Sequence, residues 1–354
     1  MNARHALGKP GSRSAAGGSG PAGGASAAVA YSRAAGSAAV ECAWCGRPFD
    51  GRDEHRPGRI RCRRCGVATT SPWPGDRRLA AAYGGWYRPE TGRFSGFGDA
   101  LLRRTRSTLA RCLHWRLPRG PVLDVGAGDG TLVRAFRRNG REALGVDPYT
   151  PNADPHVRAG EIEDVAGTWS GIIFWHSLQH LRRPARALRY AASLLVPGGL
   201  LVIALPNAAS LQARLFGDRW FHLDLPRQLV HLTRPALLAE LEALGLRVER
   251  VRYLRGGQVL FGWLHGIVGR LPGHPDLYDA IRRRQARRAG QRPAVRLYAL
   301  AAAVAVLPLA LVATAVEVGT RSGGTLYVEA RRRPDPAGGR HSRPARGRGL
   351  ARRR

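Results

Sequence analysis

Two pairs of cysteines form the clearest chemical pattern in the sequence. Cys42 and Cys45, then Cys62 and Cys65, make two CxxC motifs separated by 16 residues. Four thiolates at this spacing are typical of a tetrahedral Zn²⁺ site with metal–sulfur bonds of about 2.3 Å. Two redox-active dithiols are the alternative. A Cys₄ site has no open coordination position, so we expect a structural role for the metal in a small N-terminal zinc-binding unit.

A glycine-rich turn provides the second chemical pattern. A short apolar run, Val122–Val125, precedes Gly126, Gly128 and Gly130, and a helical pattern begins at Thr131. A dinucleotide-binding loop would place its third glycine at position 131, and a nucleoside-triphosphate loop would carry a lysine. Neither residue is present, so we expect neither class of pyrophosphate ligand.

Acidic residues accompany this turn at the ends of two expected strands. Asp124 lies two residues before the first glycine, which favours a ligand with a cationic end. Asp147 follows the expected strand Ala143–Val146, 23 residues after Asp124. A carboxylate at such a strand end can accept hydrogen bonds from both hydroxyls of a ribose. The strand–helix–strand context makes the glycine pattern much more specific than it is alone.

These residues resemble the class I S-adenosylmethionine-dependent methyltransferases, over residues 121–255 and again over 324–331. The resemblance implies an α/β fold with a Rossmann-like seven-stranded methyltransferase sheet. It also implies the cofactor S-adenosyl-L-methionine, with its methionine part against the glycine turn and its ribose at Asp147. Among the acids after the third strand, Glu161 is our prediction for the adenine contact.

The region after the fourth expected strand departs from the family pattern. That strand, Ile172–Trp175, leads into the sequence His176-Ser-Leu-Gln-His180, and Leu200–Leu205 is the fifth expected strand. We assign His176 to the cofactor pocket. Many relatives carry Glu-His where this chain has Gln179 followed by the second histidine. The resemblance therefore implies a cofactor pocket that is altered on this side.

A narrower resemblance indicates a bacterial subgroup with an N-terminal zinc-knuckle unit and a tyrosine-rich linker, echoed here by Tyr83 and Tyr87. Several members modify sugars, surface polysaccharides or secondary metabolites. The subgroup favours Pro-Arg-His, whereas this chain has Gln228 in the histidine position, and His231 is the nearby substitute. The segments that carry this resemblance are Leu205–Ser210, Phe216–Trp220 and Leu223–Thr233.

Methyl transfer from a sulfonium is an in-line displacement that depends on positioning, with help from a general base when the acceptor is a hydroxyl. Four histidines are candidate bases: His176, His180, His222 and His231. We predict His180 and His231 as catalytic residues, and a structural role is the alternative for each histidine. Arg227 is a candidate clamp for an acidic substrate group, with a structural ion pair as the alternative.

The composition excludes some classes of protein and leaves others open. The 354 residues include 57 Lys+Arg and 25 Asp+Glu, a formal charge of +32, and Lys9 is the one lysine. The arginine and alanine excess indicates genomic bias as much as a polyanionic partner, so nucleic acid ranks second. Five cysteines exclude a disulfide scaffold, and Cys112, alone on an apolar helical face, is predicted to be buried. The first 40 residues show no secretory signal, which favours the cytoplasm.

A run of 20 uncharged residues, Leu297–Val316, follows seven arginines that lie between Arg282 and Arg296. Its length suits a bilayer crossing. Residues 324–330 read as the last strand of the sheet, inserted antiparallel, so the chain must return to the same side. We therefore predict an interfacial or re-entrant helical element over 282–316 at the inner face of a membrane. A buried helix or a homodimer face is the alternative.

The expected organisation is a flexible tail (1–40), a zinc ribbon-like unit (41–70), a helical linker (71–119) with a helix at Ala100–Leu113, a methyltransferase domain (120–256 with 322–332), an apolar and basic insertion (257–321) and a basic tail (333–354). We expect methylation of a hydroxyl or similar nucleophile on a small molecule, a sugar or a glycan- or lipid-linked intermediate. The alternatives are an RNA or protein methyltransferase and a non-catalytic zinc-bearing binding protein with a degenerate methyltransferase fold.

Overall fold

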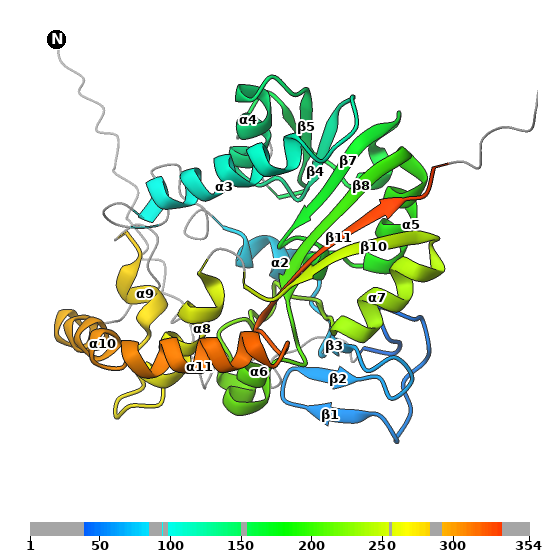
Figure 1. The fold of residues 1–354 in the computed structure, drawn as a ribbon. Helices are drawn as coiled ribbons and strands as arrows, with labels where there is room; N and C mark the ends of the chain where they lie inside the picture. The colour runs from blue at the N-terminus through cyan, green and yellow to red at the C-terminus, as the bar shows by residue number, and fades with distance from the viewer. Residues whose placement is uncertain are drawn as a thin grey trace, which may run out of the picture.

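The computed structural model describes the chain in six stretches (Figure 1). These are residues 39–84, 94, 98–149, 154–254, 257–283 and 292–334. Most of the two tails expected at 1–40 and 333–354 therefore lies outside the described residues. Tyr87 and the arginines at 284, 287 and 288 lie outside them as well.

A seven-stranded mixed sheet forms the centre of the molecule and confirms the expected fold class (Figure 1). Its order is β10-β11-β8-β7-β4-β5-β6. Neighbouring strands from β8 to β6 run parallel, whereas β11 lies antiparallel between β8 and β10, as expected for the last strand. The strands are β4 (Val122–Val125), β5 (Ala143–Val146), β6 (Val157–Arg158), β7 (Trp169–Trp175), β8 (Leu195–Pro206), β10 (Leu246–Arg252) and β11 (Thr325–Arg332).

The short apolar runs form the central strands because both faces of the sheet are covered. All four residues of β4 are buried. Strand β7 begins three residues earlier than the apolar pattern predicts, because its polar residue Ser170 can form a hydrogen bond within the sheet. Its hydroxyl lies 2.9 Å from the carbonyl oxygen of Gly120 and 2.8 Å from that of Pro121. Strand β8 likewise begins at Leu195 rather than Leu200.

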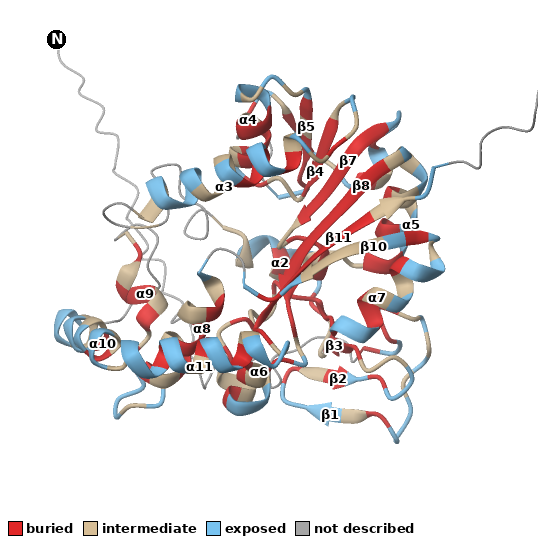
Figure 2. Ribbon diagram, viewed as in Figure 1, coloured by how far each residue is buried: buried red, intermediate tan, exposed pale blue. Residues whose placement is uncertain are grey.

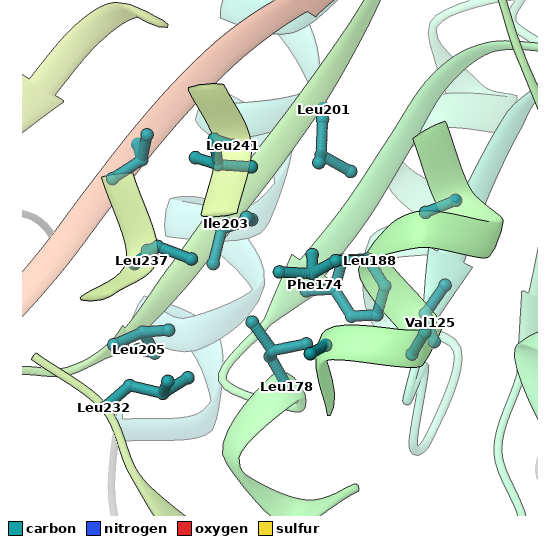
Figure 3. Packing of buried hydrophobic residues seen from close by; sticks show 14 of the residues in the cluster. Val125, Phe174, Leu178, Leu188, Leu201, Ile203, Leu205, Leu232, Leu237 and Leu241 are labelled. Carbon is teal, nitrogen blue, oxygen red and sulfur yellow. The ribbon is translucent and has the colours of Figure 1, made fainter. Parts of the chain in front are cut away.

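Helices pack on both faces of this sheet and bury one apolar cluster on each. The cluster in Figure 3 includes Phe174 of β7, Ile203 of β8, Leu188 of α5 and Leu237 of α7. On the opposite face, α3 and α4 bury a second cluster that includes Phe136. The helices are α3 (Gly98–His114), α4 (Thr131–Arg138), α5 (Pro184–Leu194) and α7 (Arg234–Ala243).

The cysteine-bearing unit is a small antiparallel sheet that is joined to the central domain. It contains β1 (Glu54–Arg56), β2 (Arg59–Arg61) and β3 (Ala68–Thr70). A fourth strand, β9 (Val230–His231), comes from the segment that follows β8 and pairs with β3. The helix α2 (Asp76–Ala82) follows this unit. Backbone hydrogen bonds therefore connect the N-terminal unit to a loop of the central domain.

Helices form the region between β10 and β11. They are α8 (Gln258–Val268), α9 (Leu277–Ile281), α10 (Pro293–Ala305) and α11 (Leu307–Gly319), and α6 (Leu211–Phe216) packs against α8. Among the described residues no single helix has the length and hydropathy of a membrane crossing, although α10 and α11 meet those criteria as a pair bent by 58°. Pro308, in the first turn of α11, has no N–H to continue α10.

One expectation from the sequence needs correction. Cys112 is exposed rather than buried, because α3 directs Leu109, Ala110 and Leu113 at the sheet and the cysteine lies on another side of the helix. The uncharged run Leu297–Val316 lies in α10 and α11, whose outer faces are exposed (Figure 2). The expected contact of this run with a membrane stays a prediction.

Candidate active site

The glycine turn after β4 has the backbone conformation that its residue types require. Gly126, Gly128 and Gly130 have φ angles of 74°, 59° and 71°, a region that favours glycine. A Cβ atom on Gly126 would clash with the side chain of Ser177, whose hydroxyl donates a hydrogen bond to the carbonyl oxygen of Val125. The turn is therefore narrow and presents backbone rather than side chains to a ligand.

The two predicted aspartates lie on neighbouring strands beside this turn, and both are buried. Asp147 follows β5, and its carboxylate accepts hydrogen bonds from the backbone N–H of Gly128 at 2.9 Å and of Tyr149 at 2.8 Å. A carboxylate can accept about four hydrogen bonds. These two bonds fix the orientation of the Asp147 carboxylate against the glycine turn.

Aromatic residues lie next to Asp147 and connect it to the linker. Burial raises the pKa of Tyr149, and the nearby carboxylates of Glu161 and Asp147 add to the rise. Glu161 is exposed at the start of the short helix η1 (Ile162–Asp164). The ring of Tyr83, at the end of α2, stacks on Tyr149 with centroids 4.4 Å apart. The structure thus brings Asp147 and Glu161 to one edge of the sheet, with the linker close by.

His176 lies directly after β7 in a conformation that is uncommon for a non-glycine residue, with φ at 55°. Its N–H donates a hydrogen bond to the carbonyl oxygen of Ala204 at 2.7 Å. Burial lowers the pKa of His176 well below its ordinary value, and the proximity of Arg106 and of the imidazoles of His222 and His180 lowers it further. Three of the candidate histidines therefore gather at the carboxyl end of β7, where open α/β sheets bind their ligands.

A family model described as a methyltransferase domain matches residues 97–251, which include the glycine turn, both aspartates and all four candidate histidines. Residues 97–251 form a methyltransferase domain. The match ends within β10, so the N-terminal cysteines and the helices α8 to α11 lie outside it.

Individual relatives are similar over part of this methyltransferase domain. Ubiquinone biosynthesis O-methyltransferase of Xanthomonas campestris pv. campestris (strain B100) is 28% identical over 133 residues, 32% of this chain and 56% of the relative. The protein of that name from Psychrobacter arcticus is 30% identical over 104 residues, 24% of this chain and 40% of the relative. The chain thus spans about half the length of these relatives. A solved S-adenosylmethionine-dependent methyltransferase from Archaeoglobus fulgidus covers 65% of this chain and 94% of its own length, with 16% identity and a TM-score of 0.40.

In the methyltransferase domain, the ring of His180 is oriented by a backbone carbonyl. Its Nδ1 lies 2.7 Å from the carbonyl oxygen of Arg227. A carbonyl oxygen only accepts, so Nδ1 donates, and the neutral ring has its acceptor lone pair on Nε2. The ring edge also meets Tyr83, with centroids 6.3 Å apart. His180 is thus oriented as a general base requires, close to the tyrosine that contacts the Asp147 side of the site.

His231 lies at the junction with the cysteine-bearing unit. The hydroxyl of Thr70 donates to the carbonyl oxygen of Gln228 at 2.6 Å, so it accepts from Nε2 of His231 at 3.1 Å. The buried Nδ1 of His231 has no hydrogen-bond partner within the described residues. Burial lowers the pKa of His231 to about 3, and the proximity of Arg59 and of the His180 imidazole lowers it as well. His231, predicted as a base, therefore forms a buried hydrogen bond to Thr70 that has a structural role.

Arg227 and Gln179 have contacts within the chain. The guanidinium of Arg227 donates two hydrogen bonds to Asp224 and one to the carbonyl oxygen of Ala82 at 3.0 Å. This is the structural ion pair that was the alternative to a substrate clamp. The backbone carbonyl of Gln179 accepts from the N–H of Leu229 at 2.9 Å. The hydrogen bonds from Arg227 to Ala82 and from Leu229 to Gln179 hold the loop before β9 next to α2 and the segment of His180.

An aromatic cluster, defined here as Phe221, His222, Phe261, His265 and Tyr278, lies beside these histidines. Phe221 is at its centre, with ring centroids 4.8 Å from His222, 4.9 Å from Phe261 and 5.3 Å from Tyr278. His222 is buried, its Nε2 has no partner within the described residues, and burial lowers its pKa to about 3. The uncharged imidazole of His222 therefore lies in apolar surroundings on this side of the site.

The four predicted cysteine ligands come together as the spacing requires. Their sulfur atoms all lie within 4.8 Å of one another, with Cys42–Cys65 at 3.6 Å and Cys45–Cys62 at 3.8 Å. Bonds of about 2.3 Å in a tetrahedron place sulfurs about 3.8 Å apart, so the geometry fits Zn²⁺. Glycine follows the second cysteine of each pair with φ near 70°, which closes both turns.

Sequence reasoning missed two arginines that contact these sites. Arg47 pairs with buried Asp53 close to Cys62, and its position directly after a Cys-Gly turn was an available signal. Arg106 of α3 lies over the ring of Trp175 at 4.6 Å from the centroid, close to His176. Nothing local in the sequence marks Arg106, because its contact depends on how α3 packs on the sheet.

Proposed function

We propose that this chain transfers a methyl group from S-adenosyl-L-methionine to a hydroxyl or similar nucleophile of a small molecule, a sugar or a glycan- or lipid-linked intermediate. The observation that carries the proposal is the placement of the glycine turn, Asp147 and Glu161 at one edge of the sheet, with His180 linked to them through Tyr83. The name of the relatives, which are O-methyltransferases, supports oxygen as the acceptor atom.

The residues at the site fit this cofactor. The buried carboxylate of Asp124 suits the ammonium group of a methionine moiety, and the carboxylate of Asp147 suits a ribose diol. A Cβ atom on Gly126 would clash with Ser177, so the turn beside the two aspartates requires glycine at this position. Glu161, exposed at the same edge, is an acceptor for an adenine amino group. When bound, the cofactor supplies a methyl group on a sulfonium, open to in-line displacement.

The side chains of this chain have two tasks in such a reaction, positioning and proton transfer. Asp147 would hold the ribose of the cofactor, and the orientation of its carboxylate is fixed by the N–H groups of Gly128 and Tyr149. His180 accepts the proton of the acceptor hydroxyl at Nε2 as the oxygen attacks. The hydrogen bond from its Nδ1 to the carbonyl oxygen of Arg227 keeps the ring in the required tautomer.

The aromatic cluster supports an acceptor with an apolar part. Its rings lie next to His222, which is itself within electrostatic range of His176. Aromatic side chains bind apolar and ring-containing ligands through large contact areas. An acceptor held there would present its hydroxyl towards the carboxyl end of β7. We therefore favour a lipid-linked or aromatic acceptor over a free sugar.

We further propose that the cysteine cluster holds one structural Zn²⁺. The sulfur separations fit the metal, and four protein ligands leave no coordination position for chemistry. Thiolate ligands persist in a reducing compartment, so we place the protein in the cytoplasm. The metal would stabilise the turns before β1 and after β2, and through β3 it would support β9.

Calorimetric titration with S-adenosylhomocysteine tests the cofactor site. We expect binding by the wild-type chain and at least about tenfold weaker binding by Asp147→Asn, since a hydrogen bond to a charged group is worth about 1.5–3 kcal/mol. Glu142→Gln is the matched control, because Glu142 is an exposed carboxylate at the other end of β5. A wild-type chain that releases no heat on titration would overturn the enzyme assignment.

Transfer of a labelled methyl group tests the acceptor. The purified chain is incubated with labelled S-adenosylmethionine and an extract of bacterial cells, which is then separated into lipid, glycan, small-molecule, RNA and protein fractions. We expect label in the lipid, glycan or small-molecule fractions. Label confined to RNA or protein would contradict the proposed acceptor class while leaving the cofactor assignment intact.

A further inference from the structure

Helix α11 buries polar side chains and exposes large apolar ones. A helix that covers a core in water normally does the opposite. Its inward side includes Glu317, which is fully buried, together with Thr314 and Ala310. Its outward side carries large apolar residues, among them Leu309 and Val312, which are 60% and 62% exposed. Leu297, Tyr298, Val304, Leu307, Leu311 and Val316 extend this exposed surface over both helices. We call these eight residues the apolar face of α10–α11; Figure 2 shows exposed stretches along both helices in pale blue.

The orientation of this face is fixed by a buried hydrogen-bond network. The carboxylate of Glu317 accepts from the backbone N–H of Gln212 at 2.9 Å, from its Nε2 at 2.8 Å and from Nε1 of Trp263 at 2.9 Å. Rotating α11 to hide its apolar face would leave all three donors and the carboxylate without these partners, which is costly for buried groups. The apolar face therefore stays outside.

Both ends of the helix pair are tied to the body of the molecule. Arg296, in the first turn of α10, donates a hydrogen bond from Nε to the carbonyl oxygen of Ala280 at 2.8 Å. After α11 the chain enters β11, which pairs with β8 and β10 from Thr325 onward. A pair held at both ends lies along the surface of the molecule (Figure 1). That arrangement suits an element in the plane of an interface rather than a complete crossing.

The charge around this face favours one occupant, an anionic lipid surface. From Ala280 to Val316 the sequence contains no acidic residue. Arg292, before α10, and Arg321, after α11, are both exposed. Arginines beside an apolar face are the arrangement that binds anionic headgroups while apolar side chains enter the acyl boundary. A second copy of the chain would bring the same positive charge, +32 in total, against itself.

We propose that the apolar face of α10–α11 lies in the interfacial region of an anionic membrane, with Arg292 and Arg321 at the level of the phospholipid headgroups. The helices lie in the membrane plane, and the sheet remains in the aqueous phase. This proposal is independent of the acceptor and of the cofactor, because it depends on the surface of helices that lie outside the matched domain.

Flotation of the purified full chain with vesicles tests this proposal. We expect the wild-type protein to float with vesicles of phosphatidylglycerol and phosphatidylcholine, and to stay at the bottom with phosphatidylcholine alone. The double variant Leu309→Ser, Val312→Ser should reduce partitioning onto anionic vesicles by at least about tenfold, because it removes two large apolar side chains from the contact. Trp115→Ser is the matched control, since Trp115 is an 86% exposed apolar residue at the end of α3.

Other outcomes of this experiment overturn the proposal. Equal flotation of the wild type and the double variant would show that the arginines bind without the apolar face. A dimer in sedimentation that the same double variant abolishes, with no flotation of the wild type, would show that a second copy covers the face. Thermal unfolding of each variant provides the folding control, and the exposed positions of both substitutions should leave the midpoint within a few degrees of the wild type.

Discussion

At the scale of single residues, His180 is the histidine best equipped for proton transfer. The carbonyl oxygen of Arg227 holds its Nδ1–H, so Nε2 is the basic nitrogen. We predict that His180→Gln lowers the turnover of methyl transfer by about 10²–10⁴-fold, the usual contribution of a general base. The affinity for S-adenosylhomocysteine should stay within about twofold. Initial rates with the labelled acceptor fraction measure the first quantity, and calorimetry measures the second.

His55→Gln is the control for this substitution, because His55 is an exposed histidine on β1 of the cysteine-bearing unit. Its turnover should match that of the wild type. If His180→Gln retains full turnover while His231→Gln loses it, the base is His231 acting through its unpartnered Nδ1. The two histidines differ in this way because His231 already shares its Nε2 proton with Thr70.

Residue types that act within a few positions of a strand end could be predicted from the sequence. Asp124, Asp147 and the glycine turn lie where a short apolar run ends, and the structure places them as that local pattern indicates. Tyr149 and Arg106 could not be predicted in the same way. Their positions depend on contacts with Tyr83 and Trp175, which are distant in the sequence and meet only in the folded chain.

At the scale of elements, the pairing of β3 with β9 couples the cysteine-bearing unit to the methyltransferase domain. Ala68 lies opposite His231, and the loop before β9 supplies the carbonyl that orients His180. We predict that loss of Zn²⁺ loosens this loop as well as the metal turns. Amide exchange over residues 224–232 should accelerate by about tenfold or more after chelation, because local opening loses the support of β3.

Hydrogen exchange followed by mass spectrometry checks this prediction on the full chain. Cys62→Ser should behave like the chelated protein, and metal analysis should find no zinc in it, against one zinc expected per wild-type chain. Cys112→Ser is the matched control, because it removes the exposed cysteine of α3, which lies apart from the cluster. Faster exchange confined to residues 41–70 would contradict coupling through β3 and leave only a local role for the metal.

Elements with a strong local pattern were predicted closely, and those defined by tertiary contacts were not. Strands β4 and β5 begin and end at the predicted residues, and α3 differs from the predicted helix by two residues at its start and one at its end. Strand β9 has only two residues and exists because β3 lies beside it. The uncharged run predicted as one element is divided by Pro308, and its buried face could be identified only from the contacts of Glu317.

At the scale of the whole molecule, stability should depend on pH through three histidines with a lowered pKa, His176, His222 and His231. Burial lowers the pKa of His222 and of His231 to about 3, whereas a histidine in the unfolded chain titrates near 6.5. Between these values the unfolded chain binds protons that the folded chain does not. The free energy of unfolding is therefore highest above about pH 6.5, where these imidazoles are neutral in both states. It falls as the pH falls towards 3, by about 1.4 kcal/mol per pH unit for each group.

Urea unfolding at pH 7.5, 6.5 and 5.5 measures this dependence in the wild type and in His231→Gln. The glutamine amide can donate to Thr70 as Nε2 of the histidine does, and it does not titrate. The variant should lose about a third of the acid destabilisation that the wild type shows between pH 6.5 and 5.5, because His176 and His222 still contribute. Release of metal at low pH affects both proteins alike, so the difference in slope isolates the histidine. Identical slopes would show that His231 is protonated in the folded chain, which its burial between β3 and the loop at Gln228 opposes.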